Sequence, residues 1–249
     1  VDVEVNPDLI DSIKKIGAKQ GTSFVATFVA AFEIFMHRIT GSEDIVVGLA
    51  AAGQSLEGKQ NLVGHCVNLL PLRSKINSHS TFNEYLKLRK PEILDAYDHQ
   101  RYTFGSLIQK LNIPRDPSRI PLVPVSFNVD LGITNGVNFE GCSYTFTTNP
   151  RNCENFEFFI NAAGSGREMT LECTYNTDLF DRATIERLAQ HYGVLLEGIA
   201  KAPQRFISEL PFLTQAERDQ LLIEWNGATV PYPAQPCIHQ LFEAHAASN

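Results

Sequence analysis

The sequence predicts an α/β fold, more closely an α+β sandwich in which helices pack on one side of a mixed sheet. Three observations predict this class: buried apolar runs of strand length, helical segments long enough to cross over between strands, and a meander of strands in the second half of the chain. With 249 residues, of which 43% are apolar, the chain can bury a substantial core.

The first half of the chain alternates strands with helices. Residues 1–5 alternate apolar and acidic side chains and predict a short strand, after which Asn6 caps a helix that begins at Pro7. A second helix is expected over 22–39, where apolar side chains occur on nearly every face, so it should be central and buried. The next expected elements are a buried strand at 44–50 that runs parallel to its neighbours, a glycine-rich loop at 51–64, a strand at 64–73, and helices at 81–97 and 104–111.

A strand meander occupies the second half. Strands are expected at 124–129, 137–146, 156–162 and 169–175, with a hairpin turn between the last two. After these strands, Asp181 begins an amphipathic helix that continues to residue 199.

The composition changes after residue 202, where prolines become frequent among polar residues. Two helical segments remain, at 215–225 and 239–246. We therefore expect a folded unit over 1–202, a linker over 203–236, and the start of a further domain over 237–249.

Charge and composition exclude several functional classes. The net charge of −7 and the pI near 5.5 argue against nucleic acid as a partner. No apolar run approaches the roughly 20 residues that span a bilayer, and the first residues do not form a signal peptide. The five cysteines are scattered without a CxxC pair, so we expect reduced, mostly buried thiols in a cytoplasmic protein.

Motifs for metal binding or covalent catalysis are not found. The histidines show no HExxH pattern, and no metal site is expected; His65 and His99 are the two kept as candidates. Ser126 lacks the GxSxG context of a nucleophile. Asn68 and Arg73 lie within and at the exit of a buried strand, so both must be paired, and structure alone could explain them.

Residues 115–130 join a charged turn to a buried strand. Asn128 and Asp130 come where that strand is expected to emerge into a cavity. Arg115 and Arg119 flank Asp116 in the turn. Ion pairs that fasten the turn are the favoured interpretation of these arginines, and a position at the mouth of a binding site is the alternative.

Three co-linear stretches resemble the later motifs of the condensation domains of nonribosomal peptide synthetases. They read GHCVNLLPLR (64–73), DHQRYTFGSLIQKL (98–111) and RDPSRIPLVPVSFNVD (115–130). The tail LTQAERDQLLIEWNGATVPYP and the final residues CIHQLFEAHAA are similar to the junction with an adenylation domain and to its beginning. Thr103 and Val123 replace the Pro and Phe of the family pattern, and neither position is reactive.

The resemblance implies that this chain is the C-terminal half of a condensation domain, with a fold like that of chloramphenicol acetyltransferase. The catalytic HHxxxDG motif of the family is not in this sequence and is expected upstream, in the N-terminal half. The implied partners are that half, a donor and an acceptor peptidyl carrier protein, and an adjacent adenylation domain. No cofactor is expected to bind directly, because the carriers present the phosphopantetheine arms. The implied reaction joins two carrier-bound thioester substrates through an amide bond.

The same resemblance assigns supporting roles to residues of this chain, and none as principal catalyst. Asn128 would face the tunnel between the two halves, and Arg73 would pair with the aspartate of the upstream motif. The loop at 51–63 and the strand region at 137–148 would join the halves. Further candidates for the tunnel wall or the carrier-facing surface are Asn68, His65, His99, Ser126, Arg115 and Arg119.

Other functions remain open at this point. A related catalytic alternative is half of an epimerisation or heterocyclisation domain, which differ mainly in the upstream motif, although the tail that resembles an adenylation junction favours condensation. From a different class, it is compatible with a non-catalytic scaffold that docks carrier proteins. In every case we expect the isolated chain to be inactive, since the histidine motif is absent from it.

Overall fold

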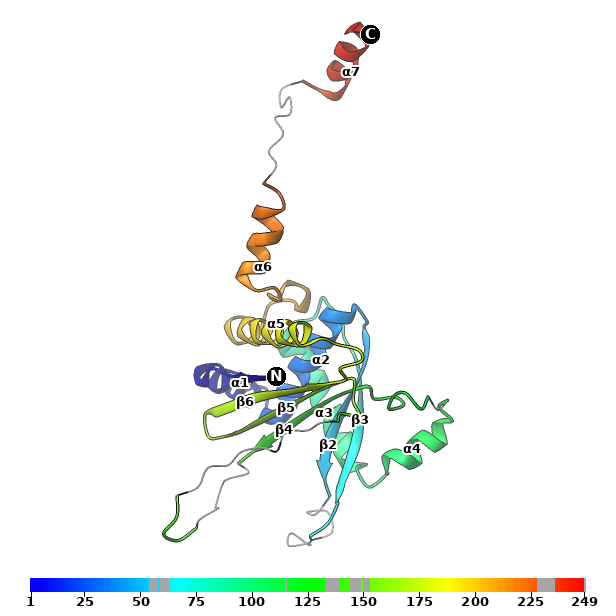
Figure 1. Ribbon diagram of the computed structural model, residues 1–249, viewed down its shortest axis with the longest axis vertical. Helices are drawn as coiled ribbons and strands as arrows, with labels where there is room; N and C mark the ends of the chain where they lie inside the picture. Colours follow the sequence, from blue (N-terminus) through cyan, green and yellow to red (C-terminus); the bar gives the residue numbers. More distant parts are fainter. Residues whose placement is uncertain are drawn as a thin grey trace. The chain divides into compact units, whose positions relative to one another are not determined.

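The computed structural model describes residues 1–53, 58, 63–114, 116–132, 139–143, 149, 153–227 and 236–248 (Figure 1). These residues belong to two compact units, Val1–Phe212 and Leu213–Asn249. All strands of the described sheet lie in the first unit.

Among the described residues, six strands form one mixed sheet in the order β1-β6-β5-β4-β2-β3. β4 is parallel to both of its neighbours, and the remaining pairs are antiparallel. The strand predicted at 44–50 is therefore parallel to one neighbour and antiparallel to the other, because β3 returns directly beside it. The strands are β1 (Asp2–Glu4), β2 (Asp44–Ala52), β3 (Val67–Lys75), β4 (Val125–Leu131), β5 (Phe158–Ser165) and β6 (Glu168–Tyr175).

Helices cover one face of this sheet, and the predicted sandwich class is confirmed (Figure 1). α4 instead lies beside β3. The helices of the first unit are α1 (Pro7–Lys19), α2 (Phe24–Thr40), α3 (Phe82–Asp98), α4 (Phe104–Leu111), α5 (Arg182–Lys201) and the short 3₁₀ helix η2 (Ile207–Glu209). Each α-helix begins at a side chain that accepts a first-turn N–H, which satisfies one backbone donor there: Asn6, Ser23, Thr81, Thr103 and Asp181.

The predicted central helix, α2, packs against the sheet and against α5. Phe28, Phe32 and Phe35 of α2 are fully buried. The ring of Phe32 stacks on Phe127 of β4 with centroids 4.7 Å apart and meets the edge of Tyr192 of α5 at 5.7 Å. Because α2 contacts the sheet, α1, α3 and α5, apolar side chains are needed on almost every side of it.

A buried ion pair joins α2 to α3. The carboxylate of Glu33 is fully buried, and the guanidinium of Arg89 is 2% exposed and lies 2.7 Å away (Nη2 to Oε1). The hydroxyl of Tyr85 donates to the same carboxylate at 2.6 Å. Glu33 is therefore an acidic residue that the apolar helix tolerates only because its partners are fixed on α3.

The strand meander differs from its prediction in one segment. β5 and β6 form the expected hairpin, with Gly166 at φ +63° in its turn. Residues 139–143, inside the strand predicted at 137–146, instead contain a turn in which the Cys142 N–H donates to the Phe139 carbonyl at 3.0 Å. The rest of that predicted strand lies outside the described residues, as do residues 54–57 and 59–62 of the loop predicted at 51–64.

The segment directly after α5, residues 203–212, is part of the first unit, so the linker predicted to begin at residue 203 begins too early. Ile207 and Leu210 are buried, and the guanidinium of Arg38 donates to both of their carbonyls at 2.9 Å. The second unit contains the two predicted helical segments. The first is α6 (Gln215–Asp219), continued by the π-helical turn η3 (Gln220–Glu224), and the second is α7 (Ile238–Ser248).

The cysteines are free, but their predicted burial is wrong for most of them. Cys173 is buried and Cys66 half-buried, whereas Cys142, Cys153 and Cys237 are exposed. Burial raises the pKa of the Cys173 thiol to about 12, so this thiol stays protonated and unreactive near neutral pH.

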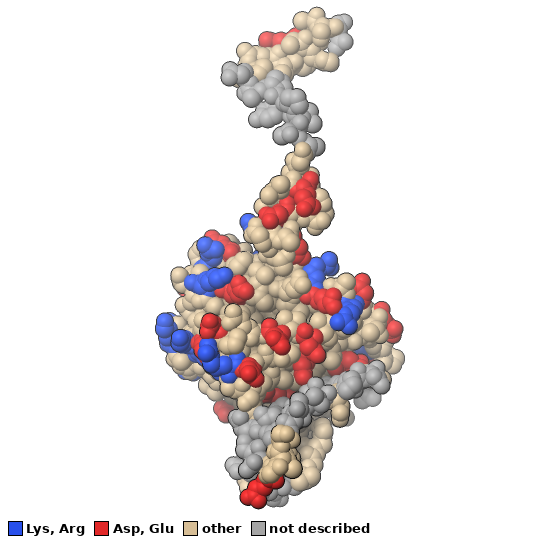
Figure 2. Space-filling model, turned by 60° about the vertical axis from the view of Figure 1, so that its left-hand side comes forward, with Lys and Arg blue, Asp and Glu red and all other residues tan. Residues whose placement is uncertain are grey.

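Acidic and basic side chains are interspersed over the face seen in Figure 2, which presents no continuous basic stripe in its described part. A phosphate backbone would need such a stripe. Among the described helices, none is by itself long and apolar enough to cross a bilayer. α1 and α2 pass that length and composition test only together, as a pair bent by 104°.

The carboxylate caps of two helices make the stability of the fold decrease at low pH. The Thr184 N–H holds the pKa of Asp181 below its usual range, and the Thr81 N–H does the same for Glu84. A carboxyl whose folded-state pKa is depressed contributes stability above its unfolded pKa and loses it as the pH falls through the folded value. We expect the midpoint temperature of thermal unfolding, measured by circular dichroism, to decrease as the pH is lowered from about 5 to about 3.

A matched variant isolates the contribution of one cap. Asp181→Asn keeps an acceptor for the Thr184 N–H but removes the titration. Its midpoint should therefore fall less steeply over the same pH range than that of the wild type. An unchanged slope would show that the Asp181 cap does not contribute to the acid dependence.

Candidate functional site

The face of the sheet opposite the helices carries a band of polar side chains. Side chains alternate along a strand, so the burial of Phe127, Ile160 and Leu171 against the helices places their neighbours on the open face. Asn128 is one of these neighbours and is half-buried. β4 continues three residues past it, so the prediction that Asn128 lies at the end of the strand is wrong.

Asn128 belongs to a hydrogen-bonded row across three strands. It pairs in register with Asn161 of β5, which pairs with Glu172 of β6. The side-chain NH₂ of Asn128 donates to Oδ1 of Asn161 at 3.0 Å, and the NH₂ of Asn161 donates to Oε2 of Glu172 at 2.8 Å. We call these three residues the amide row.

Ser126, two residues before Asn128, has a structural role. Its side chain is 2% exposed, and its hydroxyl donates to the Gly48 carbonyl of β2 at 3.1 Å. This bond crosses the point where β2 and β4 pair. A hydroxyl held in this way strengthens a short parallel pairing and does not face a cavity.

Arg73 is exposed at its position in β3, and the expectation that it is buried is wrong for this chain. Its guanidinium holds Asp44 of β2 in a bidentate pair, with Nε 2.8 Å from Oδ1 and Nη2 2.5 Å from Oδ2. The Arg73 hydrogen bonds hold the pKa of Asp44 below its usual range. The pair fixes the direction of the guanidinium at the open face.

The charged turn before β4 is fastened in two places. Asp116 accepts hydrogen bonds from the N–H and the hydroxyl of Ser118, at 2.9 and 2.6 Å. Arg119 forms its ion pair with Glu157, directly before β5, rather than with Asp116. Arg115 lies outside the described residues.

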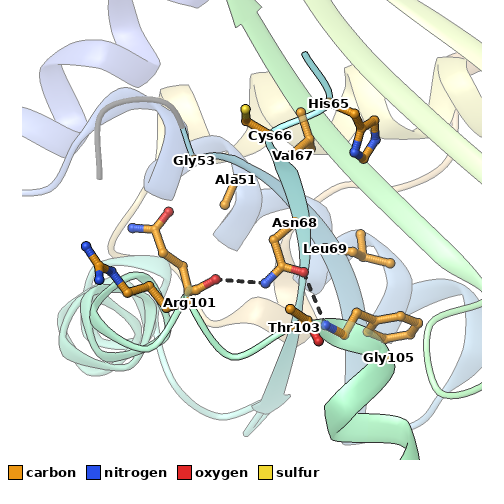
Figure 3. Close-up of a pocket in the computed structure, with 12 residues that line it drawn as sticks. Ala51, Gly53, His65, Cys66, Val67, Asn68, Leu69, Arg101, Thr103 and Gly105 are labelled. Atoms are coloured by element: carbon orange, nitrogen blue, oxygen red, sulfur yellow. Dashed lines mark hydrogen bonds between the residues drawn. The ribbon is translucent and has the colours of Figure 1, made fainter. Parts of the chain in front are cut away.

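A separate pocket of about 670 Å³ lies between the β2–β3 edge and the start of α4 (Figure 3). Its lining includes His65, Cys66, Asn68, Gln100, Arg101 and Thr103. Figure 3 shows Asn68 reaching from β3 to the loop that precedes α4. The side-chain NH₂ of Asn68 donates to the carbonyls of Gln100 and Tyr102, at 2.8 and 3.0 Å, and its oxygen accepts the Phe104 N–H at 3.2 Å.

The two candidate histidines occupy different surroundings. His65 is exposed at the pocket wall, and no described residue is seen to hydrogen-bond its ring. His99 caps the end of α3, is 75% exposed, and lies with Nδ1 2.9 Å from the Asp95 carbonyl. That hydrogen bond, followed by the Asp95 charge, raises the pKa of His99.

The structure thus separates the candidates into three groups. His65 and Asn68 share the pocket, Asn128 and Arg73 lie on or near the open face, and Arg119 lies at the turn. Ser126, at the β2–β4 pairing, and His99, at the end of α3, lie apart from these groups. Within the described parts of the chain there is no cluster of three metal-ligating side chains. The geometry supplies hydrogen-bond acceptors and donors that can orient a substrate, rather than a nucleophile with its base.

Two members of the amide row, Asn161 and Glu172, were not among the predicted site residues. Alternation along β6 gives a signal for Glu172, since every second residue from Glu168 to Thr174 is polar. Their alignment with Asn128 depends on strand order and register, which local pattern does not reveal.

Comparison with known proteins identifies one matching family. The sequence model described as "Condensation domain" matches residues 1–222. Tyrocidine synthase 3 of Brevibacillus parabrevis is 33% identical over 245 residues, which represent 96% of this chain and 4% of the synthase. The chain thus spans a small fraction of that relative.

Solved structures that share the fold include the following two. Holo-AB3403, a four-domain nonribosomal peptide synthetase bound to AMP and glycine, has a TM-score of 0.79 and 17% identity, over 88% of this chain and 18% of that one. The condensation domain of the monacolin K polyketide synthase MokA has a TM-score of 0.75 and 19% identity, over 83% of this chain and 48% of that one. The fold expected from the sequence motifs is therefore confirmed.

Proposed function

The chain belongs to the condensation-domain family, and from this premise we propose that it forms the C-terminal half of a domain that makes amide bonds in a nonribosomal peptide synthetase. The observation that carries the proposal is the family match over residues 1–222. Coverage of 48% of the MokA condensation domain supports the assignment as one half of a domain.

Exposed apolar side chains support a missing partner half. β4 runs parallel to β2, and β3 runs antiparallel to β2. The C-terminal end of β4 and the N-terminal end of β3 therefore lie at the same end of the strands. Val67 and Leu131 are 48% and 46% exposed there, and Val63, shortly before β3, is 98% exposed. Such an apolar group is typical of a surface that another domain covers.

In the proposed reaction, two carrier proteins present substrates as thioesters on phosphopantetheine arms. The amine of the acceptor attacks the carbonyl carbon of the donor, the new C–N bond forms, and the C–S bond breaks to release the donor thiol. A proton lost by the amine is taken up with the help of the histidine motif of the N-terminal half. This chain contributes side chains that orient the reactants in the tunnel.

Asn128 and Arg73 are the supporting residues in this proposal. Asn128 provides a positioned amide on the open face. The Nε and Nη2 edge of Arg73 holds Asp44, so Nη1 remains for the aspartate of the upstream motif. His65 and His99 are then surface residues of the acceptor or donor mouth.

The tail is proposed to lead into an adenylation domain. In α7, Ile238 and Phe242 are 87% and 74% exposed. A helix that leaves such side chains uncovered fits the beginning of a domain whose core lies further along the chain. We assign residues 1–212 to the condensation half, ten residues more than the 1–202 expected from composition, then the linker up to residue 236 and the adenylation start over 237–249.

A two-carrier peptide-transfer assay tests the function. We expect no amide product from this chain alone, and product when the chain is joined to an N-terminal half that carries the paired-histidine motif. Asn128→Ala in the joined protein should lower the rate constant about 100- to 1,000-fold, the scale of losing one preorganised polar group in an active site. Amide product from the chain alone would contradict the proposal, and an epimerised or cyclised product would assign the chain to a related class. Carrier binding without any product from the joined protein would favour a docking scaffold.

A further inference from the structure

The amide row raises a question that the supporting role of Asn128 does not answer, namely which end of its amide faces a substrate. β4, β5 and β6 lie side by side in the sheet (Figure 1). The register of these strands places the three residues of the row directly opposite one another. Directly opposite residues on neighbouring strands are close enough for short polar side chains to bond. The row is therefore a continuous chain of hydrogen bonds that leads from Asn128 to a carboxylate.

The carboxylate fixes the direction of every bond in the row. An ionised carboxylate can only accept hydrogen bonds, so Asn161 must turn its NH₂ toward Glu172 and its oxygen toward Asn128. Asn128 must then turn its own NH₂ toward Asn161. The opposite orientation would place two carbonyl oxygens against each other, a contact without a donor.

Burial enforces this arrangement at the centre of the row. Asn161 is only 9% exposed, so water offers it little alternative hydrogen bonding. Its amide is used in two directions by protein partners. Asn128 is half-buried, and its Oδ1 accepts no hydrogen bond from the described residues.

We propose that Asn161 and Glu172 are positioning residues that hold Asn128 with Oδ1 directed away from the row, as a hydrogen-bond acceptor for the N–H of the attacking amine. This inference rests on the proposed function, and it names the group that Asn128 recognises. As the amine nitrogen bonds to carbon it gains positive charge, which a carbonyl oxygen stabilises and an NH₂ group would oppose. The amide carbonyl of Asn128 is not basic, so the proton itself leaves to the histidine motif of the partner half.

Inverting the charge at the end of the row tests the proposal. In the joined two-half domain, Glu172→Lys replaces the terminal acceptor by a donor and should turn both amides round. We expect kcat for amide formation to fall about tenfold or more, with KM for the acceptor nearly unchanged. Glu172→Gln, whose side-chain oxygen can still accept from Asn161, should restore most of the loss.

The matched control is Glu168→Lys. Glu168 lies on the same strand and the same face, four residues away, and its substitution makes the same change of charge outside the row. We expect its kcat to stay within about twofold of the wild type, because exposed substitutions outside special contacts have small effects. Equal losses in Glu168→Lys and Glu172→Lys, or no loss in Glu172→Lys, would overturn the proposal.

A second measurement on the 249-residue chain separates this inference from the proposed function. Hydrogen exchange of the Asn128 side-chain NH₂, followed by NMR, should be slowed in the wild type and in Glu168→Lys, and accelerated about tenfold or more in Glu172→Lys. If the joined domain makes no amide but exchange follows this pattern, the positioning of Asn128 stands and the proposed function fails. If exchange at Asn128 does not depend on Glu172, the positioning role fails whatever the activity.

Discussion

Arg89→Ala is expected to lower the free energy of unfolding by about 3 to 5 kcal/mol, the cost of leaving a buried charge without its partner. Arg89 donates to Glu33 through Nε at 3.0 and 2.9 Å and through Nη2 at 2.7 Å, and its Nη1 reaches Glu92 at 2.5 Å. The Glu33 carboxylate holds the pKa of Arg89 above its usual value despite burial. Without Arg89, the hydroxyl of Tyr85 is the one side-chain donor that Glu33 keeps among the described residues. Urea denaturation of the chain measures the loss.

A double variant distinguishes the unpaired charge from lost packing. Glu33→Leu combined with Arg89→Met removes both charges and keeps apolar volume, so it should be more stable than Arg89→Ala alone. If the double variant is as unstable as the single one, the loss comes from packing.

The pH dependence gives an independent check on Arg89→Ala. Burial raises the pKa of Glu33, and loss of Arg89 removes the main opposing interaction. A carboxyl with a raised folded-state pKa contributes its stability below the unfolded pKa and loses it as the pH rises through the folded value. The deficit of Arg89→Ala relative to the wild type should therefore shrink as the pH is lowered.

Local patterns predicted the elements whose causes are local. The caps at Asn6 and Asp181 and the glycine turn of the hairpin depend on residues within a few positions of one another. The central place of α2 also followed from its sequence, since a helix that is apolar on every side is stable only when surrounded. Glu33 within it is a local anomaly that signals a buried partner without identifying one.

Partners set by long-range pairing could not be read from the sequence. Asp44, the partner of Arg73, lies 29 residues earlier and meets it through the register of β2 and β3. Asn128 and Asn161 are 33 residues apart. Both contacts depend on strand order, which a single sequence leaves open.

The prediction for the end of β4 is wrong for a specific physical reason. Asn128 and Asp130 were interpreted as the point where a buried strand emerges, because polar residues interrupt its apolar run. The run alternates instead: Phe127 and Val129 face the helices while Asn128 and Asp130 face the open side. One strand therefore carries part of the core on one face and part of the candidate site on the other.

This double role makes Phe127 the position where a loss of core packing should also reach the candidate site. Phe127 is fully buried, stacks on Phe32 at 4.7 Å, and lies 6.3 Å from the Tyr192 ring, so Phe127→Ala should cost about 3 to 5 kcal/mol. Phe127→Leu, which keeps most of the volume, should cost clearly less, and Phe242→Ala, at a ring that is 74% exposed, less than about 0.5 kcal/mol in urea denaturation.

The same variants test whether the core fixes the amide row. Asn128 follows Phe127 on β4, so a shift of the strand into the cavity left by Phe127→Ala would lengthen the bond from Asn128 to Asn161. Exchange of the Asn128 side-chain NH₂ should then accelerate in Phe127→Ala and remain slow in Phe127→Leu. The measurement is made without denaturant, at a pH where both variants are folded. An unchanged exchange rate of the Asn128 NH₂ in Phe127→Ala would mean that the amide row holds β4 in place without support from the core. Glu172 alone would then set the orientation of the Asn128 amide.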